Sequence, residues 1–321
     1  MALTGFTAVG FIGLGAMGKH MAEHLANKLP QESQIYVYDV VNTVMDELAA
    51  KYPGKITAGT SPRNVAENTK FILSMVPEGA HVKTVFLDET TGVCTVDLQD
   101  RILIDCSTID TETSLLVKQH ISDHHPSASY YDAPVSGGTL GAQKGTIAFF
   151  LGCSSTDPNL GLITDLLSLM GKKVIPCCKP SLGLAAKLCN NYLSGLIAIA
   201  SSESLNTGIR AGLDPRVLSH VIAAGTAQNA ICDDYNPCPG VVPDAPSTNG
   251  YQGGFKVQLM KKDFSLAMQL AESVGSNLVL GQPGLDTYIA AADDPRCRDR
   301  DSRVVFRFLG GDETWASKFS D

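Results

Sequence analysis

The chain has 321 residues, a length that favours two domains over a single compact core. Its fractions of hydrophobic residues (44%) and charged residues (18%) are typical of a globular protein rather than a disordered or fibrous one. The net charge of −8 would repel a phosphate backbone, and no apolar run looks long enough to cross a bilayer, so we expect no nucleic-acid partner and no membrane partner.

The N-terminal half alternates between short apolar runs and helix-forming segments. Apolar, β-branched or aromatic runs, which predict strands, lie at Phe6–Ile12, Ile35–Tyr38, Phe71–Val76, Ile102–Ile104, Tyr130–Tyr131, Ile147–Leu151 and Val174–Ile175. Helix-forming segments such as Met17–Asn27 and Val44–Lys51 separate many of them. This alternation is typical of a parallel sheet covered on both faces. We therefore predict an α/β Rossmann-like N-terminal domain with a parallel-type sheet over residues 1–181.

The sequence pattern changes after Gly183. From Leu184 to Ala211 there is no proline, and only two glycines interrupt a pattern that predicts one long helix. Beyond Pro215 the pattern stays helical, apart from the loop Tyr235–Gly254, which is rich in proline, glycine and asparagine. We predict a long interdomain helix that opens an all-α C-terminal domain over residues 182–321.

A glycine-rich turn follows the first predicted strand and opens a helix. It consists of Gly13, Leu14, Gly15, Ala16, Met17 and Gly18. Such a turn lets the backbone approach a pyrophosphate, which then lies at the positive end of the helix dipole. Asp39 ends the second strand, where its carboxylate can accept both ribose hydroxyls of NAD and would repel the 2′-phosphate of NADP. We predict NAD as the cofactor; the alternative is a glycine-rich turn with an unrelated surface acid.

We expect no metal site. The nine cysteines form no CxxC pair, which favours scattered reduced thiols. His20 and His24 match the H-x-x-E-H zinc pattern, but Met21, Ala22 and Leu25 are the natural packing residues of that helix, which turns both histidines away from the sheet.

Two later segments contain residues suited to binding a carboxylate and to acid–base catalysis. Ser136, Gly137 and Gly138 offer a hydroxyl and unhindered backbone amides, a suitable cradle for a carboxylate. Lys187 and Asn191 are spaced i, i+4, so they project from one helix face and form a candidate acid–base pair beside a nicotinamide. The spacing alone leaves open that both are ordinary residues of a helix surface.

These motifs, in this order over nearly the whole chain, resemble those of the β-hydroxyacid dehydrogenase family. The resemblance implies that Lys187 is the catalytic residue, that Asn191 is its partner, and that Ser136, Gly137 and Gly138 bind the substrate carboxylate. It also places four residues at the cofactor, with the first three lining the nicotinamide side of the NAD groove: Val76, Pro77, Thr108 and Lys262. His81 departs from the family pattern, because related enzymes can carry an amide side chain there.

Within the family, the loops Tyr235–Gly240 and Asn249–Phe255 resemble the branch that oxidises 3-hydroxyisobutyrate to methylmalonate semialdehyde with NAD, a step of valine breakdown. The alternatives are a glyoxylate or succinic-semialdehyde reductase and, more remotely, a non-catalytic NAD-binding sensor. The resemblance implies a mitochondrial matrix enzyme, although the chain shows no address and a cytoplasmic location is the alternative. Long apolar helices indicate a homodimer or homotetramer formed through the C-terminal domain.

Overall fold

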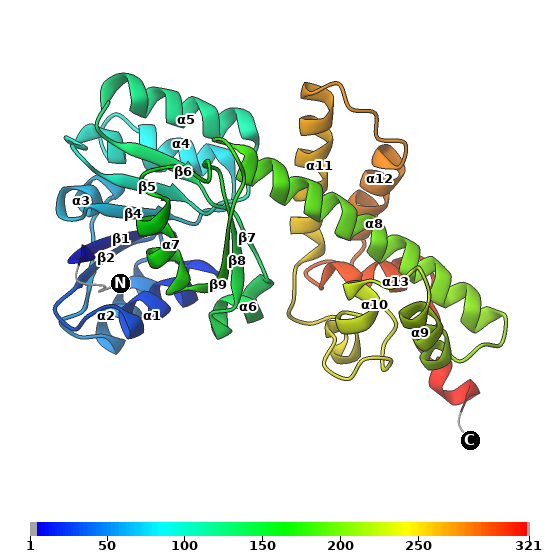
Figure 1. The fold of residues 1–321 in the computed structure, drawn as a ribbon. Helices are drawn as coiled ribbons and strands as arrows, with labels where there is room; N and C mark the ends of the chain where they lie inside the picture. The colour runs from blue at the N-terminus through cyan, green and yellow to red at the C-terminus, as the bar shows by residue number, and fades with distance from the viewer. Residues whose placement is uncertain (1–4, 320–321) are drawn as a thin grey trace. The chain divides into compact units, whose positions relative to one another are not determined.

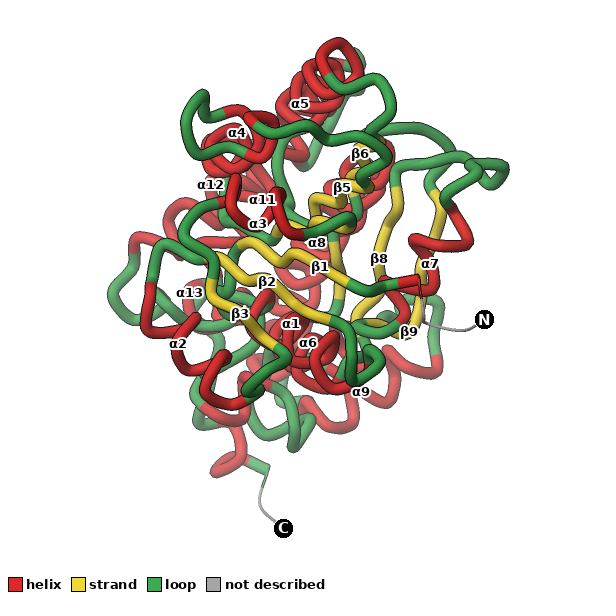
Figure 2. Tube along the Cα trace, turned by 90° about the vertical axis from the view of Figure 1, so that its left-hand side faces the viewer, coloured by secondary structure: helices red, strands yellow, loops and turns green. Residues whose placement is uncertain are grey.

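The computed structural model describes residues 5–319, and the chain divides into two compact units, Met1–Lys187 and Leu188–Asp321. Unit 1 is built on a six-stranded sheet with the strand order β3-β2-β1-β4-β5-β6. Figure 2 shows β3, β2 and β1 side by side in this sheet. Its strands are β1 (Ala8–Ile12), β2 (Gln34–Tyr38), β3 (Ile56–Ala58), β4 (Phe71–Ser74), β5 (Ile102–Asp105) and β6 (Ser129–Asp132). All neighbouring strands are parallel, so their carboxyl ends meet at one edge of the sheet.

Helices cover both faces of this sheet (Figure 1). They are α1 (Gly18–Lys28) and α2 (Asn42–Lys51) on one face, and α3 (Pro62–Asn68), α4 (Gly79–Leu87) and α5 (Thr111–His124) on the other. The alternation of side chains along each strand separates two cores. Phe11 packs in the core that contains Met21 of α1, whereas Ile12 packs in the core that contains Val65 of α3. The predicted Rossmann-like sheet, buried on both faces, is confirmed.

A second, three-stranded sheet belongs to the same unit. It consists of β7 (Val135–Ser136), β8 (Ile147–Leu151) and β9 (Gly171–Pro176), accompanied by α6 (Gly138–Lys144) and α7 (Leu160–Ser168). β8 is parallel to β9 but antiparallel to β7. The sequence did not indicate β3 or β7, because β7 has two residues and two of the three residues of β3 are exposed.

The later part of the chain is helical. Its helices are α8 (Leu182–Arg210), α9 (Pro215–Ala224), α10 (Ala230–Asp234), α11 (Val257–Ser273), α12 (Gly281–Asp293) and α13 (Val305–Phe308). Short 3-10 turns lie in this part at Pro246–Asn249, Ser302–Val304 and Trp315–Lys318, and another lies in unit 1 at Val93–Thr95. Phe264 of α11 and Tyr288 of α12 are fully buried in unit 2, and the Tyr288 hydroxyl donates to the Gly195 carbonyl of α8 over 2.8 Å. The all-α C-terminal domain is confirmed.

Helix α8 carries the boundary between the units. It has 29 residues, and its residues 182–187 belong to unit 1 while the rest belong to unit 2. With a mean hydropathy of 1.2 over its most apolar window, it is long and apolar enough to cross a bilayer by length and composition alone. The expectation that no run reaches this length was therefore wrong. The run was underestimated because polar residues such as Asn190 and Asn191 interrupt it.

Candidate functional site

The glycine-rich turn has the geometry that a dinucleotide needs. Gly13 has a φ of +92°, a conformation that favours glycine, and a β-carbon there would clash with the Met75 carbonyl oxygen. A β-carbon on Gly18 would clash with the Gly13 carbonyl oxygen, whereas one on Gly15 would meet nothing within 4 Å. The turn is therefore tightly packed on the protein side and open at Gly15, so these residues fit a bound pyrophosphate.

Asp39 lies beside this turn, immediately after β2. Its Oδ2 accepts a hydrogen bond from the Leu14 amide over 2.6 Å, and its Oδ1 accepts one from the Val41 amide over 2.8 Å. A carboxylate has about four acceptor sites, so each oxygen keeps one site for a ribose hydroxyl. The structure thus brings Asp39 to the glycine-rich turn, and it gives Asp39 a second role in holding that turn that the sequence did not indicate.

The predicted nicotinamide-side residues lie in two neighbouring loops at the carboxyl edge of the sheet. Val76 and Pro77 follow β4, and Thr108 follows β5. The Met75 amide donates to the Ile12 carbonyl over 2.8 Å, which places the first loop directly against the turn that begins at Gly13. His81 lies exposed in the first turn of α4.

Ser136, Gly137 and Gly138 form the end of β7 and the start of α6. Gly137 has a φ of +133° and Gly138 one of +62°, so both positions favour glycine. A β-carbon on Gly138 would meet nothing within 4 Å, which leaves this part of the backbone accessible to a small ligand. Ser136 is half-buried and pairs with Ala148 of β8.

Asp132, a residue that the sequence did not single out as functional, anchors the start of α8. Its two carboxylate oxygens accept hydrogen bonds from the amides of Ser181 (2.7 Å) and Leu184 (2.9 Å). Burial raises the pKa of Asp132, although these backbone amides act in the opposite direction. Ser136 follows Asp132 by four residues and Lys187 follows Leu184 by three, so one buried carboxylate joins the two segments that carry them.

Lys187 and Asn191 lie one turn apart on α8, and both side chains are buried, each with 6% exposed. Within unit 2, the Asn191 amide nitrogen donates to Oδ2 of Asp263 over 2.6 Å, and Oδ1 of Asp263 forms an ion pair with Lys262 at 3.2 Å. The structure therefore brings Asn191 and Lys262 together around Asp263. The sequence motif contained Asp263, but its position beside Lys262 gave no sign that it contacts Asn191.

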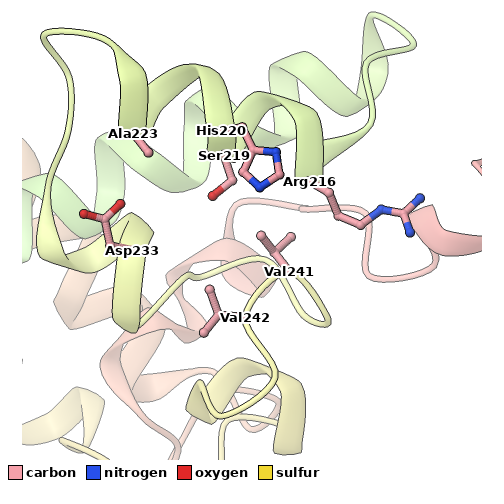
Figure 3. A pocket seen from close by; sticks show the side chains of 7 residues that line it. All are labelled: Arg216, Ser219, His220, Ala223, Asp233, Val241 and Val242. Atoms are coloured by element: carbon pink, nitrogen blue, oxygen red, sulfur yellow. The ribbon is translucent and has the colours of Figure 1, made fainter.

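The histidine pattern of α1, the cysteines and a pocket in unit 2 lie outside the group of predicted site residues. Met21, Ala22 and Leu25 are buried as expected, while Nε2 of His24 contacts the carbonyls of Ala142 and Gln143 at 3.0 and 3.1 Å. The nine cysteines are free, as predicted. A separate surface pocket in unit 2 is lined by side chains of α9, α10 and the following loop: Arg216, Ser219, His220, Ala223, Asp233, Val241 and Val242 (Figure 3). None of these described lining residues is a predicted site residue, and Arg216 points away from the others.

Two family models match the chain. Residues 8–179 match the NAD-binding domain of 6-phosphogluconate dehydrogenase, and residues 182–309 match the model described as "NAD-binding of NADP-dependent 3-hydroxyisobutyrate dehydrogenase". The chain therefore contains an NAD-binding domain, in agreement with the geometry of the glycine-rich turn.

Similar proteins extend over nearly the whole chain. A Dictyostelium discoideum protein named "Probable 3-hydroxyisobutyrate dehydrogenase, mitochondrial" is 38% identical over 96% of this chain and 92% of its own length. A Pseudomonas aeruginosa 3-hydroxyisobutyrate dehydrogenase is 35% identical over 86% of this chain and 89% of its own length. The solved structure of Mycobacterium tuberculosis 3-hydroxyisobutyrate dehydrogenase with L-serine has a TM-score of 0.85 and 30% identity, and it covers 95% of this chain and 99% of its own.

Proposed function

Because the chain belongs to the 3-hydroxyisobutyrate dehydrogenase family of NAD-binding oxidoreductases, we propose that it oxidises 3-hydroxyisobutyrate to methylmalonate semialdehyde with NAD. The observation that carries this proposal is a lysine buried on the helix that Asp132 anchors. Lys187 has 6% of its side chain exposed, and a buried lysine one turn before a buried amide is suited to proton transfer rather than to solubility.

In this proposal the chain's own residues bind the substrate and move one proton. Ser136, Gly137 and Gly138 hold the carboxylate, and the neutral Nζ of Lys187 accepts the proton of the substrate hydroxyl. Asn191 orients that hydroxyl from the next turn of α8. The nicotinamide would supply the hydride acceptor; Val76, Pro77 and Thr108 would line its site, and Lys262 would lie near the cofactor. In the reverse direction the Lys187 ammonium returns the proton to the forming alkoxide.

Asp39 supports NAD over NADP in this proposal. The hydrogen bond from the Leu14 amide holds the Asp39 carboxylate beside the glycine-rich turn. A 2′-phosphate brought to this position would meet the negative charge of that carboxylate. Repulsion between these groups is the physical reason that an acid at this strand end favours NAD.

A substrate panel tests the proposed function directly. Purified protein is assayed with short 2-hydroxy and 3-hydroxy acids, each with NAD and with NADP, and with glyoxylate and succinic semialdehyde in the reductive direction. We expect the highest kcat/KM for 3-hydroxyisobutyrate with NAD, and weaker turnover of L-serine, a 3-hydroxy acid that shares the carboxylate and the primary hydroxyl. Faster reduction of glyoxylate or succinic semialdehyde with NADPH would overturn the substrate assignment. Binding of NADH without turnover of any acid would identify a sensor instead of an enzyme.

The proposal also includes a location and an assembly. Several relatives carry the word mitochondrial in their names, including those from Rattus norvegicus and Homo sapiens, and we propose the same compartment for this chain. We also propose that the reaction is a step of valine breakdown and that the chain forms a homo-oligomer. Fluorescence microscopy of the tagged full-length protein tests the compartment, since a diffuse cytosolic signal would contradict it.

A further inference from the structure

A buried polar cluster lies behind the two loops that carry Val76 and Thr108. Its centre is Asp105, the last residue of β5, which stands in register with Ser74 at the end of β4. Oδ1 of Asp105 accepts hydrogen bonds from the Ser74 hydroxyl (2.7 Å) and from the Ser107 hydroxyl (2.6 Å), and the Ser107 amide lies 3.2 Å away. Ser74, Asp105 and Ser107 are each at most 1% exposed. A carboxylate at this depth that collects three donors fixes the backbone around it.

The cluster reaches both loops through Ser107. The Ser107 hydroxyl donates to Asp105 and accepts a hydrogen bond from the Val76 amide over 2.9 Å. The chain of hydrogen bonds from Val76 through Ser107 to Asp105 therefore joins the loop after β4 to the loop after β5. These are the loops that hold Pro77 and Thr108.

We propose that Asp105 is a positioning residue for the nicotinamide, acting through Ser107 to hold loops 75–77 and 106–108 in the arrangement that receives the cofactor. This inference rests on the proposed function, because it assumes that these loops line the nicotinamide site. Asp105 itself is buried behind the loops and acts only through Ser74, Ser107 and the backbone.

The protonation state of Asp105 gives the cluster a measurable signature. Burial raises the pKa of Asp105 to about 6, while the hydrogen bonds from Ser107 and Ser74 lower it and the charge of Asp132 raises it. The other titratable groups around Asp105 are Tyr130 on β6 and Cys106 beside it, and burial raises the pKa of both well above neutrality. The carboxylate is therefore charged at pH 7.5 and gains a proton as the pH falls through about 6. Since a neutral carboxyl group is a weaker acceptor, the cluster loosens on the acid side.

Direct binding of NADH, followed by its fluorescence from pH 5 to pH 8, tests this inference without any turnover. We expect the Kd of the wild type to rise as the pH falls through about 6. In Asp105→Asn the Kd should be about 3- to 30-fold weaker at pH 7.5 and should no longer change over this pH range, since the amide keeps the size but cannot titrate. Ser107→Ala, which keeps the carboxylate but removes the hydroxyl that links it to the Val76 amide, should weaken binding by a similar factor.

Three further variants separate positioning from mere stability. Ser74→Ala removes a hydrogen bond that lowers the pKa of Asp105, so the midpoint of the pH dependence should move up by as much as about one unit. Ser202→Ala is a matched control: its hydroxyl is equally buried but donates only to the Ala198 carbonyl of its own helix, so NADH binding should be unchanged. His81→Gln should keep the pH dependence, since His81 is exposed on α4.

The possible failures are distinguishable. A wild type that binds no NADH at any pH contradicts the proposed function itself. A wild type that binds NADH, with Asp105→Asn and Ser107→Ala showing the same Kd and the same pH profile, overturns only the role of Asp105. Loss of the pH dependence in His81→Gln, with its retention in Asp105→Asn, also overturns it.

Discussion

Asp39 holds the Leu14 amide, and in the proposed function the same side chain also provides the negative charge at the ribose position. Asp39→Ser removes that charge, so the preference for NAD over NADP should fall by at least about 10-fold in the ratio of the two kcat/KM values. The ratio is the right measure, since the lost hydrogen bond to Leu14 weakens both cofactors alike. Asp46→Ser, at an exposed position of α2, is the control and should leave the ratio unchanged. Equal use of both cofactors by the wild type would contradict the role of Asp39.

Lys187 is the residue on which the proposed chemistry depends. Lys187→Met should lower kcat by about 10²- to 10⁴-fold, the usual loss when a positioned acid or base is removed. The Kd for NADH should barely change, because Lys187 lies on α8 and not on the glycine-rich turn. Lys187→Arg should fail nearly as badly, since a guanidinium cannot release its proton at the working pH. Lys179→Met, at an exposed position just before α8, should behave like the wild type. Near-normal turnover of Lys187→Met would exclude the mechanism.

Ser136 offers a test of substrate binding that is independent of proton transfer. If its hydroxyl holds the carboxylate equally in the ground state and the transition state, Ser136→Ala should raise KM for the acid more than it lowers kcat. KM is expected to rise about 10- to 100-fold, the value of one hydrogen bond to a charged group. Steady-state kinetics at saturating NAD measure it, and an unchanged KM would place the carboxylate elsewhere.

At the level of single residues, the sequence indicates side chains whose chemistry is rare in their context. Gly13, Gly18 and Asp39 could be predicted, because a G-x-G-x-x-G turn between a strand and a helix, with an acid at the end of the next strand, is typical of dinucleotide binding. Asp105 and Asp263 could not, since their contacts include Ser74 and Asn191, which lie 31 and 72 residues away along the chain. Buried carboxylates of this kind are defined by which strand ends and helix faces meet, and that is a property of the tertiary structure.

At the level of elements, the sequence predicted the helices and strands that are long enough to show a continuous apolar pattern. The predicted helix from Leu184 to Ala211 agrees with α8 to within two residues at its start and one at its end. β7 was missed because two residues carry no periodicity, yet it provides Ser136. The separation of β8 and β9 into a second sheet was also missed, since strand runs show no sheet membership. The start of α8 depends on a non-local contact that the pattern does not contain, the carboxylate of Asp132.

That contact makes a prediction about α8 as a whole. Asp132→Asn keeps the size of the side chain but replaces one acceptor oxygen with an amide group that faces a backbone donor. The free energy of unfolding should fall by about 1–3 kcal/mol, the cost of a buried donor left without its acceptor. kcat should also fall, because Lys187 follows in the next turn, while the Kd for NADH should stay close to that of the wild type. Asp123→Asn, an exposed acid on α5, is the control for both measurements. A variant with normal stability and normal kcat would show that the helix start is held without Asp132.

At the level of the whole molecule, the residues of the proposed site are divided between the two units. Unit 1 contains the glycine-rich turn, Asp39, the nicotinamide-side loops, Ser136 and Lys187, and unit 2 contains Asn191, Lys262 and Asp263. The sequence placed the boundary at residue 182, where the pattern changes, whereas compactness places it after Lys187, because Asp132 and Gly183 pack the first turn of α8 against unit 1. A domain that keeps its own core can still share a helix with its neighbour.

Unit 2 carries exposed apolar side chains on α8 and α9. Leu193 on α8 has 58% of its side chain exposed, and Val217 and Val221, one turn apart on α9, have 49% and 57% exposed. Exposed apolar side chains are often covered in protein–protein contacts, so we expect the wild type to sediment at no less than about twice its chain mass of 34.0 kDa at micromolar concentration. Leu193→Glu introduces a charge that an apolar contact cannot bury, and it should weaken self-association by about 10- to 100-fold. Leu162→Glu, at a 36% exposed leucine on α7 in unit 1, is the matched control and should leave the sedimentation unchanged. A wild type that sediments as a single chain would contradict the assembly, and an oligomer insensitive to Leu193→Glu but broken by Leu162→Glu would move the contact to unit 1.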